Sequence, residues 1–294
     1  MPNGENYTVD EHFISRMYLK EFADIRESGH KEKAFLWQFN VKTMEPTPVQ
    51  VNVNSICYEK NLYELRNEDG TFIGRNTIEM AFAGIESGVS KAIKSIKCRI
   101  QNEKCINCTT FLTDEEKSML IILITTLMYR DPYTIERGIS FLKENNPELS
   151  ATQARNFTLL NLLPIGQDVN WNQNTIISTA IADLSEMAFQ VGVTTGDVIF
   201  TSDRPFVEWF SHDPIQPNKL KSLVFPLTSN IVVYLYPKED VDSIVWNYSF
   251  RLDEERVRDI QFNTAVCARE WIYTKEKLTV EQLELITKAR NRLK

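Results

Sequence analysis

The residues best placed to do chemistry in this sequence follow a short strand-like stretch near position 200. The stretch Val198-Ile-Phe-Thr-Ser-Asp-Arg-Pro205 begins with four apolar or β-favouring residues, and its proline prevents further regular pairing. A strand fixes the position of the turn that follows it, so Ser202 and Asp203 stand where α/β proteins often hold functional side chains. An Asx-type turn, in which the Asp203 side chain caps the backbone, explains the same pattern.

Three further charged residues lie on predicted helices. Glu79 and Glu86 are seven residues apart in a predicted amphipathic helix over 76–99, so they point in nearly the same direction, about 10 Å apart. Both lie on the shoulder of the apolar stripe, where a carboxylate faces either solvent or a cleft. Arg130 ends a second predicted helix, 113–130, whose continuous apolar run indicates burial. This arginine either interacts with the helix dipole or binds an anion or a carboxylate in a cleft.

The histidines and cysteines give weaker signals. His12 stands at the start of a predicted helix over 12–22, where a histidine is more often a solvated or capping group than a catalytic one. Cys105-Ile-Asn-Cys108 has half of a zinc-ribbon spacing, but the sequence holds no second CxxC and its histidines are remote. A surface loop with free thiols is therefore expected there.

The elements that must position these residues indicate an α+β fold. We expect two short, mostly antiparallel β sections packed with a predominantly helical middle and a C-terminal helical pair. The predicted strands cover 34–39, 49–53, 198–201, 221–226 and 231–236, with loops over 164–174 and 206–217. The predicted helices cover 12–22, 76–99, 113–130, 133–143, 151–163, 175–191, 252–274 and a last segment from 279. Capping boxes at Thr113, Ser150 and Thr279 mark three of the helix starts.

The composition bounds the class of protein. The chain has 294 residues, 43% of them hydrophobic, which suits a single domain over 1–294. A net charge of −7 and the lack of a Lys/Arg-rich run do not favour broad capture of a nucleic-acid backbone. The apolar run 119–128 is too short to span a bilayer, and residues 1–10 lack the apolar segment of a secretory signal. With five thinly spread cysteines, these features predict a cytoplasmic protein that does not bind membranes.

The order of several motifs resembles domain-of-unknown-function family 4238, a mostly bacterial group. The N-terminal segment that is similar, His12-Phe-Ile-Ser-Arg-Met-Tyr-Leu-Lys-Glu-Phe22, contains Tyr18. Arg204 and Asp131 depart from the residues that are common in the family. The other similar segments are Asn61-Leu-Tyr63, Ile78-Glu79, Ile85-Glu86, Arg130-Asp-Pro132, Phe200-Thr-Ser-Asp-Arg-Pro205 and Phe225-Pro-Leu-Thr228, so the resemblance covers about residues 11–270.

The resemblance implies one site built from residues that are far apart in the sequence. A histidine, carboxylates and an arginine could together hold a divalent ion, do acid–base work and bind a phosphate. The residues that it groups as a set are His12, Glu79, Glu86, Arg130, Ser202 and Asp203.

The first of two hypotheses is an enzyme that hydrolyses a phosphodiester or a nucleotide, as an effector of a toxin or phage-defence system. A divalent metal is the expected cofactor, and a nucleic acid or nucleotide the expected partner. The catalytic residues would be His12, Glu79, Glu86 and Asp203, with Asp203 and Glu86 as metal ligands or general base. Arg130 would bind the charged substrate, and Ser202, Tyr18 and Asn263 would complete the substrate site.

The second hypothesis is a non-catalytic sensor or interaction module with a protein partner. Here the polar residues form a buried structural network, with Arg130 paired to Glu86 or Asp203. The acidic balance and the absence of a Gly-rich phosphate loop, a GxSxG or an HExxH favour this alternative. Convergence of the side chains on an open pocket would support the enzyme, and mutual pairing under a closed surface would support the module.

Overall fold

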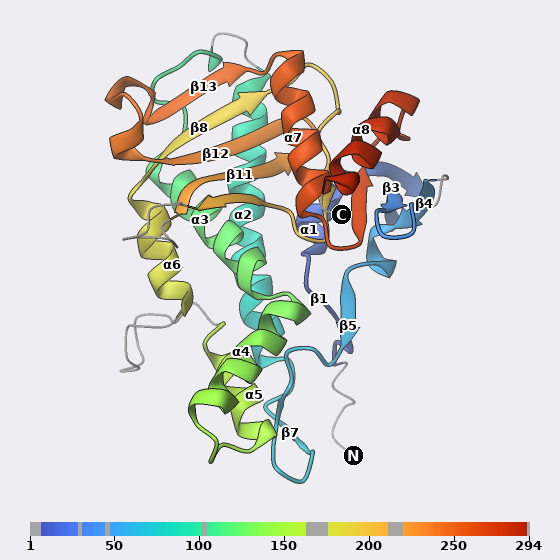
Figure 1. Ribbon diagram of the computed structural model, residues 1–294, viewed down its shortest axis with the longest axis vertical. Coiled ribbons are helices and arrows are strands. Elements are labelled where there is room, and N and C mark those ends of the chain that lie inside the picture. Colours follow the sequence, from blue (N-terminus) through green and yellow to red (C-terminus); the bar gives the residue numbers. More distant parts are fainter. Residues whose placement is uncertain are drawn as a thin grey trace.

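Two main sheets, two short strand pairs and a set of helices make up the architecture (Figure 1). The computed structural model describes residues 7–28, 31–44, 48–101, 105–162, 176–210 and 220–292. The prediction of a mixed α+β fold with mostly antiparallel sheets and a helical middle is confirmed. Among these residues, no helix is both long enough and apolar enough to cross a membrane.

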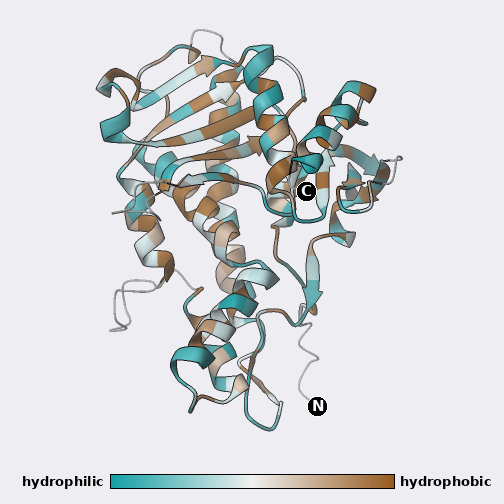
Figure 2. Ribbon diagram, viewed as in Figure 1, coloured by the Kyte–Doolittle hydropathy of each residue, from teal (hydrophilic) through white to brown (hydrophobic). Residues whose placement is uncertain are grey.

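The larger sheet has five strands in the order β10-β11-β12-β8-β13. All neighbours are antiparallel except β13, which runs parallel to β8. Figure 2 shows the hydrophobic character of β12, which begins Ile231-Val-Val, a β-branched run that favours extended backbone. The strand bounds are β8 (Met187–Val193), β10 (Val207–Phe210), β11 (Leu220–Thr228), β12 (Ile231–Pro237) and β13 (Asn247–Arg251).

The smaller sheet joins distant parts of the chain in the order β2-β3-β14-β9, with β4 also paired to β3. The predicted antiparallel pairing of the two N-terminal strands is confirmed, since Leu36 of β3 lies opposite Val51 of β4. The bounds are β2 (Asp24–Ser28), β3 (Lys31–Asn40), β4 (Val49–Asn52), β9 (Thr201–Ser202) and β14 (Trp271–Thr274). Two short antiparallel pairs lie apart from both sheets: β1 (Asp10–His12) with β5 (Tyr58–Lys60), and β6 (Leu65–Arg66) with β7 (Phe72–Ile73).

Several helices begin at a residue whose side chain caps the first turn. The capping boxes at Thr113, Ser150 and Thr279 are present, as the sequence predicts. The bounds are α1 (Arg16–Lys20), α2 (Thr77–Ile100), α3 (Asp114–Tyr129), α4 (Pro132–Asn145), α5 (Ala151–Leu160), α6 (Ile176–Ser185), α7 (Glu254–Cys267) and α8 (Val280–Asn291), and short 3-10 helices include Val53–Ser55, Lys238–Asp240 and Ser243–Val245.

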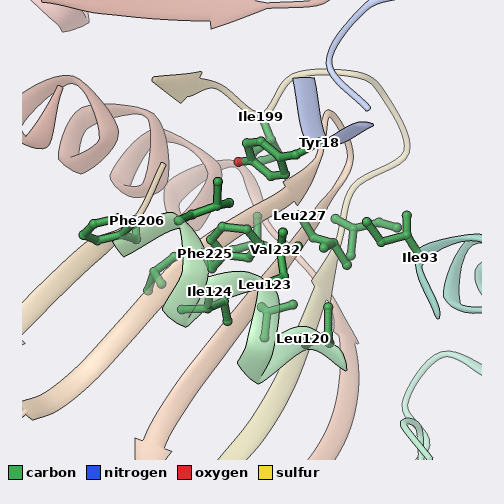
Figure 3. Packing of buried hydrophobic residues seen from close by; sticks show 14 of the residues in the cluster. Tyr18, Ile93, Leu120, Leu123, Ile124, Ile199, Phe206, Phe225, Leu227 and Val232 are labelled. Atoms are coloured by element: carbon green, nitrogen blue, oxygen red, sulfur yellow. The ribbon is translucent and has the colours of Figure 1, made fainter. Parts of the chain in front are cut away.

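The main core lies between the larger sheet and α2 and α3. Figure 3 shows Leu120, Leu123 and Ile124 of α3 packed under Phe225 and Val232 of the sheet. A second cluster joins α7 and α8 to β3 and β14, and a third joins the ends of α2 and α5. The buried side chains of α3 extend from Glu116 to Leu127, so the helix carries its last residues into the interior.

Five predicted elements are wrong in type or length. Residues 12–22 are not one helix, because His12 pairs with Tyr58 in a strand and α1 begins only at Arg16. The predicted strand over 198–201 is reduced to Thr201–Ser202. The predicted helix over 175–191 ends at Ser185 and β8 follows, since its side chains are buried on both faces and give no period of two.

The predicted helix over 252–274 ends at Cys267, and residues 271–274 form β14 between β3 and β9. A four-residue strand that is fixed by distant partners leaves no local pattern. Residues 207–210 of the predicted loop 206–217 form β10, where Val207 pairs with Val224. The rest of that loop from 211, and the predicted loop over 164–174, lie outside the described residues.

Candidate functional site

Arg130 is the centre of the candidate site. It stands at the C-terminal end of α3, and its side chain is 2% exposed. Its Nη1 donates to Glu86 Oε1 at 3.2 Å, its Nε donates to the hydroxyl of Tyr63 at 3.3 Å, and its Nη2 donates to the backbone carbonyl of His12. The guanidinium also lies 4.4 Å from the ring centroid of Phe82. Each of the three guanidinium nitrogens therefore donates one hydrogen bond to a group of the same chain.

Tyr63 links the arginine to its own helix end. The hydroxyl that accepts from Arg130 Nε donates in turn to the Arg130 carbonyl oxygen at 2.7 Å. Helices leave their last carbonyl groups without intrahelical partners, so this bond satisfies one of them in the interior. The Tyr63 ring packs edge-on against Phe82 of α2, with centroids 5.1 Å apart. Tyr63 thus holds α2 and α3 together at the level of the arginine.

Carboxyl groups lie around Arg130 and its partner Tyr63. Glu11 is fully buried, and its Oε2 accepts from the backbone N–H of Tyr63 at 2.7 Å. Burial raises the pKa of Glu11 to about 7, against the lowering effect of that hydrogen bond. Burial also raises the pKa of Glu79, against the nearby charge of Arg130. One oxygen each of Glu11, Glu64 and Glu79 is sealed from solvent without a hydrogen-bond partner among the described residues. We call Arg130, Glu11, His12, Tyr63, Glu64, Glu79 and Glu86 the Arg130 cluster.

His12 contributes its backbone rather than its ring to Arg130. The imidazole is 6% exposed and lies 5.5 Å from the ring centroid of Tyr58, and its Nε2 has no partner among the described residues. Burial, together with the charges of Arg16 and Arg130, lowers the pKa of His12 to about 4. The ring is therefore neutral at pH 7, which does not suit the role of a general acid.

Asp203 holds a turn together in a second place. Its carboxylate accepts from the backbone N–H groups of Arg269 at 2.9 Å, Glu270 at 2.8 Å and Trp271 at 3.1 Å. Burial raises the pKa of Asp203 against these three hydrogen bonds. The side chain thus fixes the turn between α7 and β14.

Ser202 closes the local turn. Its hydroxyl accepts from the Arg204 N–H at 3.2 Å and donates to the Arg204 carbonyl at 2.7 Å. A side-chain turn is present at this place, but Ser202 forms it and not Asp203.

Asp131 and Arg269 connect the two places. Asp131 caps the N-terminus of α4, where its carboxylate accepts from the Thr134 N–H at 3.1 Å. The same carboxylate pairs with the guanidinium of Arg269, whose backbone N–H donates to Asp203. Asp131, Arg269 and Asp203 therefore form a chain of polar contacts. This chain begins at the residue that directly follows Arg130.

Tyr18 and Asn263 lie elsewhere. Tyr18 is fully buried in the main core, and its hydroxyl bonds to Thr201 Oγ1 at 2.7 Å and to the Pro226 carbonyl at 2.6 Å (Figure 3). Asn263 stands on α7, where its amide donates to the Asp259 carbonyl at 2.8 Å. The structure therefore does not bring these two predicted substrate-binding residues to the Arg130 cluster.

The sequence alone does not predict a role at this site for Glu11, for Glu64 or for the hydroxyl of Tyr63. Glu11 precedes His12 in β1, and its burial depends on the pairing of β1 with β5, which the predicted helix over 12–22 concealed. Tyr63 stands in one of the motifs that carry the family resemblance, which was its available signal.

The donor set for a metal is incomplete. Among the described residues, no three His, Cys, Asp or Glu side chains are placed to hold a metal ion. Cys98, Cys105 and Cys108 are free thiols, as are Cys57 and Cys267. The residues that the hydrolase hypothesis assigned to a divalent ion, Glu86 and Asp203, are instead engaged by Arg130 and by backbone N–H groups.

Comparisons with known proteins identify a family and nothing further. A family model described as a protein of unknown function, DUF4238, matches residues 11–277. No curated protein and no solved structure matches the chain.

Proposed function

Since the chain belongs to the DUF4238 family, whose description states no function, we propose from its geometry that it is a non-catalytic sensor or interaction module. The observation that supports this proposal is the state of Arg130, which is 2% exposed and donates from all three nitrogens to groups of its own chain. An arginine that binds substrate faces a cavity that the substrate can enter, whereas the Arg130 side chain is almost fully buried. This one joins β1, α2 and α3 as a structural brace.

The competing proposal is the phosphodiester or nucleotide hydrolase. It requires Asp203 as a ligand or base, yet this carboxylate already accepts three backbone hydrogen bonds. It also requires His12 to exchange a proton near pH 7, whereas burial lowers the pKa of His12 to about 4. A ligand or partner of the proposed module would bind at the surface of the molecule. Five free thiols suit a reducing compartment.

Asp203→Asn tests the proposal, because an amide offers one acceptor oxygen to three N–H groups. We expect a loss of about 1–3 kcal/mol in the free energy of unfolding, measured by urea denaturation. Asp183→Asn, at an exposed position of α6, is the matched control and should change little. The wild-type chain should not hydrolyse nucleoside phosphates or a single-stranded oligonucleotide with Mg²⁺ or Mn²⁺ supplied.

The opposite pattern would overturn the proposal. Turnover by the wild-type chain that Asp203→Asn abolishes, at an unchanged stability, would make Asp203 catalytic. Unchanged stability without any turnover would remove the structural role assigned to the network.

A further inference from the structure

A separate hollow opens on the other side of the larger sheet, away from the Arg130 cluster. Its volume is about 540 Å³, and it lies between the outer sheet face and α7. In Figure 1, α7 crosses one face of this sheet while α2 and α3 lie behind the other. Ligand pockets commonly have volumes of about 300–1,000 Å³, so the hollow has room for one small molecule.

Aromatic rings form the floor of the hollow. Tyr234 and Tyr236 alternate along β12, so they share one face, and their rings are nearly parallel at 6° with centroids 6.1 Å apart. The Phe250 ring of β13 lies 5.8 Å from that of Tyr234. Trp209 of β10 completes the lining with 40% of its surface exposed. A sheet face with exposed aromatic rings is a surface on which planar bases stack.

Polar groups without partners surround these rings. Gln190 and Ser222 line the hollow, and neither side chain is hydrogen-bonded to another described residue. Tyr234 is 8% exposed, and within the described ranges its hydroxyl likewise has no hydrogen-bond partner. These groups face the hollow with hydrogen-bonding capacity that a ligand or water can use. The amide, which both donates and accepts, suits the edge of a heteroaromatic ring.

Helix α7 contributes one cation, one carboxylate and one amide to the lining of the hollow, in the order Arg256, Asp259 and Asn263. Arg256 and Asn263 are seven residues apart on the helix, or about 10 Å along its axis. Arg256 is exposed, and its guanidinium lies 5.0 Å from the ring centroid of Phe250. Its Nε forms a long ion pair with Asp253 Oδ2, at 3.8 Å. The Asn263 amide donates to its own helix, which leaves its oxygen free of described partners. A ligand with an anionic group at one end and a hydrogen-bonding ring at the other fits this order.

We propose that this hollow binds a nucleobase-bearing small molecule, with a nucleoside monophosphate as the best match. The base stacks on Trp209 and Tyr236, its edge meets Gln190 and Asn263, and the phosphate lies at Arg256. The shared chemistry also exists in single-stranded RNA, but a net charge of −7 favours the free nucleotide over a polymer. This inference builds on the sensor role proposed above, because it names the ligand that the module reads.

Titration calorimetry of the full chain with AMP, GMP, CMP and UMP tests the proposal. We expect at least one of them to bind, and Trp209→Ala to weaken that binding about tenfold or more, since base stacking contributes about 1–3 kcal/mol. Trp246→Ala is the matched control, because Trp246 is 41% exposed but does not line the hollow. Asn263→Leu, which fills the hollow from the helix side, is a second variant should Trp209→Ala fold poorly. Arg256→Ala should bring the affinity for the nucleotide down to that for the nucleoside.

The outcomes separate this proposal from the sensor role. No binding of any nucleotide at millimolar concentration, or binding that Trp209→Ala and Asn263→Leu leave unchanged, overturns the assignment of the hollow. Tighter Trp209-dependent binding of oligouridylate or oligoadenylate than of the monophosphates overturns the choice of a free nucleotide. Hydrolysis of the bound nucleotide would overturn the sensor role while leaving the hollow as the binding site.

Discussion

The Arg130 cluster and the α7 hollow use similar residue types in opposite ways. In the Arg130 cluster, a tyrosine hydroxyl, an arginine and carboxylates are buried and bound mainly to one another. In the hollow, the hydroxyls of Tyr234 and Tyr236 and the amide of Gln190 lie at an aromatic floor and lack hydrogen-bond partners among the described residues, while Arg256 pairs with Asp253 at 3.8 Å. Side chains that could bind or catalyse are therefore found in the structural framework of this fold as well as in the proposed binding hollow. Free donors and acceptors beside an open volume distinguish the second case.

Removing the central charge of the Arg130 cluster should have the largest effect. Arg130→Met keeps the volume of the side chain but leaves Glu86 and the neighbouring carboxyl groups without their cation. We expect a loss of about 3–5 kcal/mol in the free energy of unfolding. Equilibrium urea denaturation measures it, with Arg256→Met on the rim of the hollow as the matched control. A loss below about 1 kcal/mol would contradict the role of Arg130 as a brace.

The pH dependence of stability should reveal two opposed titrations in the Arg130 cluster. The pKa of Glu11 is raised to about 7, so its contribution is fully present below pH 4.5 and is lost as the pH rises through 7. The pKa of His12 is lowered to about 4, so its contribution is present above pH 6.5 and is lost as the pH falls through 4. In the overlapping window the two slopes have opposite signs and largely cancel.

Single substitutions should break this cancellation. Glu11→Gln retains the acceptor for the Tyr63 N–H and removes the titration of Glu11. Of the two titrations, only that of His12 then contributes to the pH dependence of stability. Relative to wild type, the stability of this variant should fall by about 2–3 kcal/mol between pH 6.5 and pH 4, at 1.36 kcal/mol per pKa unit. His12→Phe should show the reverse, a relative loss as the pH rises from 4.5 to 7. Denaturation midpoints at fixed ionic strength measure both, and parallel curves for all three proteins would refute the assignment.

Removing one tyrosine hydroxyl from each of the two regions should have the smallest effects on stability, and the two effects should differ. Tyr63→Phe removes a hydroxyl that bonds to Arg130 twice, and should cost about 1–3 kcal/mol. Tyr236→Phe removes a hydroxyl that has no described hydrogen-bond partner, and should change stability by less than about 0.5 kcal/mol. Thermal unfolding of both variants provides the measurement. Equal losses would mean that the polar groups of the hollow also support the fold.

The parts of the fold that local chemistry specifies could be predicted from the sequence. The capping boxes at Thr113, Ser150 and Thr279 start helices because each is closed within four residues. β8 and β14 could not be found in this way. The first is buried on both faces, and the second is a four-residue strand defined by β3 and β9, which lie far away in the sequence.

The candidate site was accessible only in part for a similar reason. The pairing of Arg130 with Glu86 was one of the alternatives foreseen, and the salt bridge at 3.2 Å is present. The burial of Glu11 and the bonds of Tyr63 depend on the contact between β1 and β5, which no local pattern announces. The sequence does not predict the hollow, because its pattern places Trp209 in a loop and Gln190 in a helix. A face of a sheet can be recognised only after its strands and their register are known.

The position of β14 also has a consequence for the order of folding. Asn40 of β3 pairs with Trp271, and Ser202 of β9 pairs with Ile272, so the smaller sheet is completed by one of the last strands of the chain. During synthesis, the edges of β3 and β9 stay unpaired until residues 271–274 have left the ribosome. Contacts of such long sequence separation form slowly, because most of the chain has to be closed into a loop first. Asp203 holds the turn before β14 with three hydrogen bonds, so it stabilises the strand whose pairing completes the smaller sheet.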